Sequence, residues 1–144
     1  MNIAPMKKSD MARYVDVFLC AFGGEPWNEP WTAETAQRRL SQFMNPESSF
    51  GLALEDEGEI VAFILGQYEM YYDGLRFYIQ EFCCARQGGG IGTTLLSELE
   101  QQLKAQGVVR TYLMTIHGDS TEGSYQRRGY TTDPDNIWMY KTAL

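Results

Sequence analysis

The chain has few of the side chains that build metal centres and disulfide frameworks: its 144 residues include one histidine and three cysteines. Two of the cysteines, Cys83 and Cys84, are adjacent, which matches neither a spaced zinc knuckle nor a disulfide framework. A single histidine cannot form a histidine cluster. We therefore expect no metal site and no disulfide scaffold.

Long apolar runs and an excess of positive charge are also missing. The longest apolar run, residues 61–65, is too short to cross a bilayer, and the first ten residues lack the apolar stretch of a signal peptide. These absences predict a cytoplasmic protein that does not insert into a membrane. The formal net charge of −7 disfavours nucleic-acid binding and favours cationic partners.

The composition is that of an ordinary globular protein. Hydrophobic residues make up 44% of the chain and charged residues 22%, and the length suits one hydrophobic core. We find no internal repeat and no linker-like segment, so we expect a single domain over residues 1–144. The aromatic content of 13% leaves a homodimer open, because the same residues suffice for a core.

Periodicity in the first third predicts a short strand and two helices. Apolar residues recur with helical spacing over residues 9–22, after a strand at residues 2–4. Thr32 is a suitable N-cap for a second helix, which Pro46 would bound. The proline-rich segment between the helices cannot be regular.

The period then changes to that of strands. Residues 49–84 read as three antiparallel strands, with turns at Glu57-Gly58 and Asp73-Gly74. A helix over residues 90–106, a strand at 109–116, a short helix at 121–128 and a closing strand near 136–142 should follow. This order predicts an α/β (α+β) fold with a mixed, mostly antiparallel central sheet and helices on both faces.

Four glycines in five positions, Gly88, Gly89, Gly90 and Gly92, stand where the helix over residues 90–106 begins. The first N–H groups of a helix have no intrahelical partner, and the helix dipole is positive there. Without Cβ atoms the backbone can approach a ligand closely and adopt positive φ angles, so several N–H groups can converge on one phosphate. The segment therefore predicts a pyrophosphate-binding loop.

The residue pattern decides between pyrophosphate ligands. A P-loop would need a lysine after the glycines, and a dinucleotide fingerprint would need a last glycine where Thr93 or Leu95 stands. The pattern that fits is QxxGxG, with Gln87, Gly90 and Gly92. It resembles the acyl-CoA loop, R/QxxGxG/A, of the GCN5-related N-acetyltransferase (GNAT) superfamily.

A second motif extends the resemblance over essentially the whole chain. The segment SYQRRGY is similar to the family's later YxxxGF element and places Tyr125 at its tyrosine, while Asp119 lies in a turn where the family usually has asparagine. The resemblance implies a GNAT-like fold and acetyl-CoA as co-substrate. The implied cofactor-binding residues are Phe82, Cys83, Cys84, Gln87, Gly88, Gly89, Gly90, Ile91, Gly92, Thr93, Asp119 and Tyr125.

The same resemblance implies direct acetyl transfer to a deprotonated amine, with no covalent enzyme intermediate. Main-chain N–H groups near residues 82–84 would hold the thioester oxygen, and the phenol of Tyr125 would protonate the leaving thiolate. Glu81 is our candidate base and Glu69 the competing one. Each residue also has a structural alternative. Tyr125 could be an aromatic packing residue, and Glu81 could be a sheet-edge or solvent-facing carboxylate.

The irregular segment between the first two helices is the expected acceptor site. Trp27, Glu29 and Trp31 could receive a cation through ring faces and a carboxylate, and Glu69 and Tyr71 could complete the wall. A proline-stiffened lid over the core is the alternative. The resulting hypothesis is an N-acetyltransferase for a primary amine of a small cationic molecule; the other is a noncatalytic acyl-CoA-binding regulatory module.

Overall fold

The computed structural model describes residues 1–45 and 47–144, which form two compact units, Met1–Met114 and Thr115–Leu144. Pro46, expected to bound the second helix, lies outside the described residues. The expectation of one domain over the whole chain stays a prediction.

A five-stranded sheet forms the centre of the first unit, in the order β1-β2-β3-β4-β5. Neighbouring strands from β1 to β4 are antiparallel, and β5 runs parallel to β4 because a helix connects the two. The expected mixed, mostly antiparallel sheet is confirmed. The strands are β1 (Asn2–Pro5), β2 (Ser49–Asp56), β3 (Glu59–Tyr71), β4 (Gly74–Cys84) and β5 (Val108–Leu113).

Three helices accompany the sheet: α1 (Met11–Gly23), entered through the short 3-10 helix η1 (Lys8–Asp10), α2 (Ala33–Phe43) and α3 (Ile91–Ala105). Thr32 caps α2 as predicted, because its hydroxyl accepts from the Thr35 N–H while the Thr35 hydroxyl accepts from the Thr32 N–H. In the described part of the chain, no helix has the length and apolar character that a membrane span requires.

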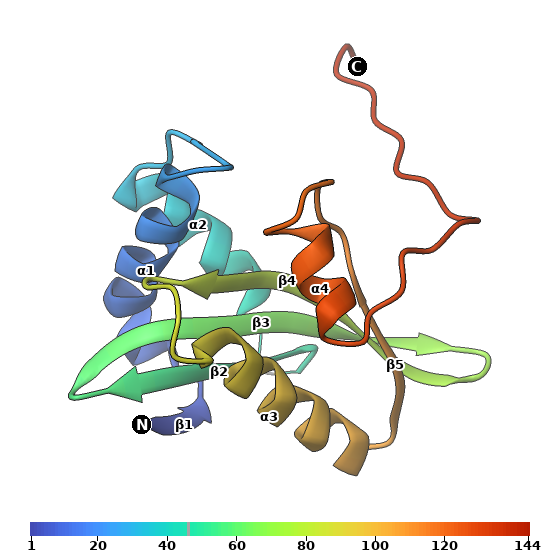
Figure 1. Cartoon of the computed structure of the whole chain (residues 1–144), viewed down its shortest axis with the longest axis horizontal. Coiled ribbons are helices and arrows are strands. Elements are labelled where there is room, and N and C mark those ends of the chain that lie inside the picture. Colours follow the sequence, from blue (N-terminus) through green and yellow to red (C-terminus); the bar gives the residue numbers. More distant parts are fainter. Residues whose placement is uncertain (46) are drawn as a thin grey trace. The chain divides into compact units, whose positions relative to one another are not determined.

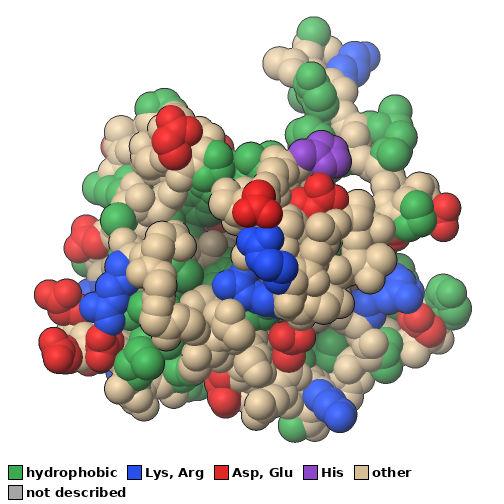
Figure 2. All heavy atoms as spheres, in the orientation of Figure 1, with side chains coloured by type: hydrophobic (Ala, Val, Ile, Leu, Met, Phe, Trp, Pro, Cys, Tyr) green, Lys and Arg blue, Asp and Glu red, His purple; other side chains and the backbone are tan. Residues whose placement is uncertain are grey.

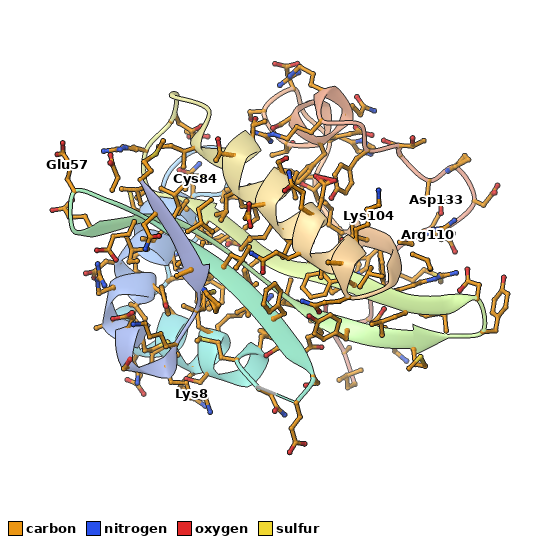
Figure 3. The ribbon with its side chains drawn as sticks, turned by 90° about the horizontal axis from the view of Figure 1, so that it is seen from below. Lys8, Glu57, Cys84, Lys104, Arg110 and Asp133 are labelled. Atoms are coloured by element: carbon orange, nitrogen blue, oxygen red, sulfur yellow. The ribbon has the colours of Figure 1, made fainter. Side chains whose placement is uncertain are left out.

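The helices cover both faces of the sheet, as expected (Figure 1). One face packs against α1 and α2 through a cluster that includes Tyr14, Phe18, Leu40, Phe63 and Cys83. Buried strand residues that alternate with this cluster point to the opposite face, which α3 covers with its own row of leucines. Figure 3 shows the molecule from the α3 side.

A β-bulge in β4 changes which face its residues occupy. Leu65 pairs with Glu81, but the next residue of β3, Gly66, pairs with Ile79, so Gln80 is the extra residue. Gly66 has no room for a side chain, since a Cβ there would lie 2.2 Å from the Tyr78 carbonyl oxygen. Beyond the bulge, Glu81 lies on the α1 and α2 face, the same face as Leu65.

The second unit contains one helix, α4 (Glu122–Arg127), close to the prediction. The strand predicted near residues 136–142 is wrong: these residues have no strand assignment. Ile137, Trp138, Met139 and Tyr140 are between 65% and 81% exposed, so their β-prone side chains lack the packed neighbours that stabilise a strand. The predicted strand at 109–116 is likewise shorter and ends at Leu113.

Candidate functional site

The glycine loop takes a backbone conformation that side chains disfavour. Gly88, Gly89 and Gly90 have φ angles of 89°, 67° and 72°, all in the left-handed region. A Cβ at any of the three would meet no atom within 4 Å, so close packing within the protein does not explain the glycines. Gly92 differs from the expectation, because it lies inside α3 and has no positive φ angle.

The loop leads directly into α3. Gly90 is its N-cap, and the first helical hydrogen bond runs from the Thr94 N–H to the Gly90 carbonyl oxygen. Ile91 anchors this end because its side chain is buried, whereas Gln87 and Thr93 are exposed. The start of α3 is held in place by Ile91, and the loop before it is exposed. The free N–H groups at such a helix start are suited to bind phosphate oxygens.

The end of β4 directs alternate N–H groups to its two sides. The Ala85 N–H donates to the Val61 carbonyl oxygen of β3, which fixes the alternation along the strand. The N–H groups of Phe82 and Cys84 therefore point away from β3, towards the side on which β5 pairs with Leu75–Ile79. The N–H of Cys83 points towards β3.

The three residues also differ in their side chains. The Cys83 thiol is fully buried in the core, and burial raises its pKa well above the ordinary value. Cys84 is half-buried on the other face, as period-two geometry predicts. Figure 3 labels Cys84 at the end of the sheet opposite Arg110. Only main-chain groups of this segment therefore suit the predicted role.

Glu81 is buried rather than solvent-facing, with 6% of its surface exposed. Its Oε1 accepts a hydrogen bond of 2.7 Å from Nε of Arg39, which α2 holds over the sheet. Burial raises the pKa of Glu81, the bond and charge of Arg39 oppose that rise, and the negative charge of Glu29 adds to it. Sequence reasoning missed Arg39, because helical spacing alone does not tell which polar residue reaches a strand.

Glu69, the competing base, lies farther along β3 and is half-buried. Its Oε1 accepts a hydrogen bond from the Tyr112 hydroxyl of β5. Burial raises the pKa of Tyr112 first, and the bond to Glu69 raises it further, so Tyr112 stays protonated and acts as a donor. Tyr112 and its neighbour Tyr78, whose ring centroids are 5.0 Å apart, were also missed by sequence reasoning.

The segment between α1 and α2 has rings that cover the core and an exposed carboxylate, so it has features of both the lid and the acceptor site. Trp31 packs edge-on against Phe18 at 5.0 Å, and Trp27 packs edge-on against Phe22 at 5.5 Å, so both rings cover the core. The Trp31 indole N–H donates to Glu29 Oε1 at 3.0 Å, which orients an exposed carboxylate whose charge acts on Glu81. Tyr71 lies apart from this segment, with its ring 3.8 Å from the Arg76 guanidinium carbon.

The remaining predicted residues belong to the second unit. Asp119 binds Arg127, whose two terminal nitrogens donate to its carboxylate and its carbonyl oxygen, each at 2.9 Å. Tyr125 lies in α4 and packs edge-on against Tyr130, with ring centroids 5.7 Å apart. Acidic and basic side chains are interspersed on the surface seen in Figure 2.

Comparison with known proteins identifies a family whose model spans the glycine loop, the end of β4 and the start of α3. The model of the acetyltransferase (GNAT) family matches residues 12–130. The chain belongs to this family. An acetyltransferase of Pectobacterium atrosepticum is 31% identical over 108 residues, covering 74% of this chain and 71% of the relative.

Solved structures agree with the fold of this GNAT acetyltransferase. A possible acetyltransferase from Clostridium difficile 630 has a TM-score of 0.84 at 12% identity, covering 99% of this chain and 98% of that one. A predicted acetyltransferase from Clostridium acetobutylicum, solved with acetyl-CoA, has a TM-score of 0.72 at 17% identity, covering 96% and 95%. The protein is an acetyl-CoA-dependent N-acetyltransferase, which favours the enzyme over the noncatalytic module.

Proposed function

We propose that this GNAT enzyme transfers the acetyl group of acetyl-CoA to a primary amine of a small cationic molecule by direct attack. The observation that carries the acetyl-CoA site is the run of left-handed glycines, Gly88 to Gly90, immediately before α3. Its main chain, with the first turn of α3, would hold the pyrophosphate. Gln87 and Thr93, both exposed, would border it.

In the proposed reaction the acceptor first loses a proton, since an alkylamine with a pKa of about 10.4 is cationic at neutral pH. Glu81 would take that proton, directly or through water, and its burial-raised pKa makes it a better proton acceptor than an exposed glutamate. The ion pair with Arg39 keeps its carboxylate available in ionised form.

The neutral nitrogen would then attack the thioester carbonyl carbon. Negative charge would develop on the carbonyl oxygen, and the N–H groups of Phe82 and Cys84 point to the side of β4 proposed for it. The carbon–sulfur bond breaks as the tetrahedral intermediate collapses, and the phenol of Tyr125 would give its proton to the thiolate. We also propose Asp119 as a residue that binds CoA.

Acidic groups on β4 and in the segment between α1 and α2 support a cationic acceptor. Glu29 and Glu81 lie close enough for their charges to interact, and Trp27 and Trp31 flank Glu29 in the same segment. The protein's net charge of −7 would favour encounter with cations. The enzyme should therefore prefer amines that carry positive charge over neutral ones such as anilines.

Thiol release from acetyl-CoA over a panel of amines tests the proposal. Acceptor-dependent release with alkylamines, polyamines or aminoglycosides is the expected result. Release only with hydroxyl or thiol acceptors would refute the amine assignment, and an acetylated enzyme seen by mass spectrometry before the acceptor is added would refute direct attack. Calorimetric titration with CoA tests the loop separately.

A further inference from the structure

Glu69 is a half-buried carboxylate that makes no ion pair with a lysine, arginine or histidine among residues 1–45 and 47–144. Its Oε1 accepts a hydrogen bond from the neutral Tyr112 hydroxyl. Two neighbouring acids are paired: Glu81 of β4 with Arg39 at 2.7 Å, and Asp73, in the turn between β3 and β4, with Arg76 at 3.0 Å. Glu69 alone among these three acids is left for an outside cation.

Arg76 lies opposite Glu69 in the sheet but is engaged elsewhere. Its guanidinium donates to Asp73 and stacks on the ring of Tyr71 at 3.8 Å. Arg110 pairs with Arg76 from β5, and neither arginine makes an ion pair with Glu69 in the part of the chain that the structure describes.

Aromatic rings border the same carboxylate. Register pairs Tyr78 with Tyr112 and Arg76 with both Glu69 and Arg110, which places these side chains on one face of the sheet. The rings of Tyr78 and Tyr112 lie 5.0 Å apart, and Tyr71 is near enough for its charge to act on Tyr112. A carboxylate among tyrosine rings is a favourable setting for an organic cation.

This setting lies on the same face as the proposed reaction centre. Glu81 pairs with Leu65, and Glu69 lies four residues farther along β3, a rise of about 13 Å at roughly 3.3 Å per residue. Tyr78 lies between the two acids: burial raises its pKa, the positive charge of Arg39 lowers it, and the charges of Glu81 and Glu69 raise it. One extended acceptor could thus contact both acids.

We propose that Glu69, oriented by Tyr112, binds a second positive charge of the acceptor, about 13 Å along β3 from Glu81, where the amine is acetylated. The inference rests on the proposed function and narrows its substrate class to linear organic polycations, such as diamines and polyamines. The reacting amine lies near Glu81, and the distal ammonium lies at Glu69 among the tyrosine rings. Tyr112 is a positioning residue, because its hydroxyl holds one carboxylate oxygen and leaves the other for the ligand.

Matched acceptors test this assignment: a series of α,ω-diaminoalkanes against n-alkylamines of the same length. The wild-type enzyme should prefer the longer diamines by kcat/KM. E69Q keeps the shape of the side chain but loses its charge, and it should lower the diamine-to-monoamine ratio about tenfold, the size of a hydrogen bond to a charged group. Y112F should lower the ratio in part, through KM rather than kcat.

E59Q is the matched control, because Glu59 is an exposed acid on the same strand and its loss changes the net charge equally. It should leave the ratio at the wild-type value. An equal loss of kcat/KM for diamines and monoamines in E69Q would overturn the inference. It would indicate that Glu69 acts as the base and does not bind the distal ammonium. A wild-type enzyme without any preference for diamines would overturn it too.

A direct binding measurement separates this inference from the proposed function. If no amine is acetylated, the proposed function is refuted. Calorimetric titration of 1,8-diaminooctane into wild type, E69Q and E59Q still tests whether Glu69 binds an ammonium group. Weaker binding in E69Q alone would support it, and equal binding in all three would refute it. Thermal melting of each variant shows whether it is folded.

Discussion

Replacing Gly89 by alanine separates the ligand-binding role of the glycine loop from its conformational role. The φ angle of Gly89 is 67°, and an alanine Cβ there would meet no atom of the protein within 4 Å. The stability cost is therefore conformational alone, about 1–2 kcal/mol for an L-residue in the left-handed region. For a chain of this size that lowers Tm by roughly 3–6 °C.

The chain provides a control with the same cost and no expected ligand. Gly58, in the turn between β2 and β3, has a φ angle of 82° and equally open space around its absent Cβ. Figure 3 shows the neighbouring Glu57 at the tip of this turn, directed outwards. Gly58→Ala and Gly89→Ala should thus lower Tm by similar amounts.

Acetyl-CoA kinetics then distinguish the two variants. If the Gly89 main chain donates to the pyrophosphate, a methyl group there should cost about 1.5–3 kcal/mol, the value of a hydrogen bond to a charged group. KM for acetyl-CoA should rise roughly 10- to 100-fold in Gly89→Ala, since 1.4 kcal/mol corresponds to tenfold. An unchanged KM in Gly89→Ala, or an equal rise in Gly58→Ala, would show that the loop does not bind the diphosphate.

Three further predictions address the chemistry and the scaffold. Tyr125→Phe should lower kcat roughly 100-fold with little change in KM for acetyl-CoA, as expected when a general acid is lost; an unchanged pH–rate profile would count against the assignment. Arg39→Gln should move the acidic limb of the kcat/KM profile to higher pH, because Arg39 opposes the burial that raises the pKa of Glu81 and the base must be ionised to act; a limb at its wild-type position would exclude Glu81 as the base. Thr32→Ala removes the cap of α2 and should cost about 1 kcal/mol, or roughly 3 °C in Tm, measured by calorimetry; an unchanged Tm would mean that the cap adds nothing.

Local patterns in the sequence were sufficient to predict most of the first unit. Turn residues such as Asp73-Gly74 bound the strands, Thr32 caps a helix, and glycine repetition before α3 marks a left-handed loop. These signals are local because they depend on the backbone preferences of single residues. Gly92 differs only in its backbone angle, because it lies within α3 and has no positive φ, unlike the three glycines before it.

The polar contacts of the site could not be predicted in the same way. Arg39 and Glu81 are joined across elements that are 42 residues apart, and Glu69 and Tyr112 across 43. Such pairs depend on strand register and on the face that each side chain occupies, which a single inserted residue reverses. The prediction of a strand at residues 136–142 was wrong for a related reason. A β-prone sequence becomes a strand only when a partner strand is available.

The extra residue at Gln80 lets Ile79 and Glu81, which are two positions apart, occupy opposite faces of the sheet. If the bulge were lost and all three residues kept strict alternation, Glu81 would share the face that α3 covers with Ile79, and its carboxylate would point away from Arg39. Deleting Gln80 would instead make the pairing regular and leave Glu81 opposite Leu65, on the face of α1 and α2. The bulge therefore lets β4 keep both a buried Ile79 and an Arg39-facing Glu81 with one residue more than a regular strand needs.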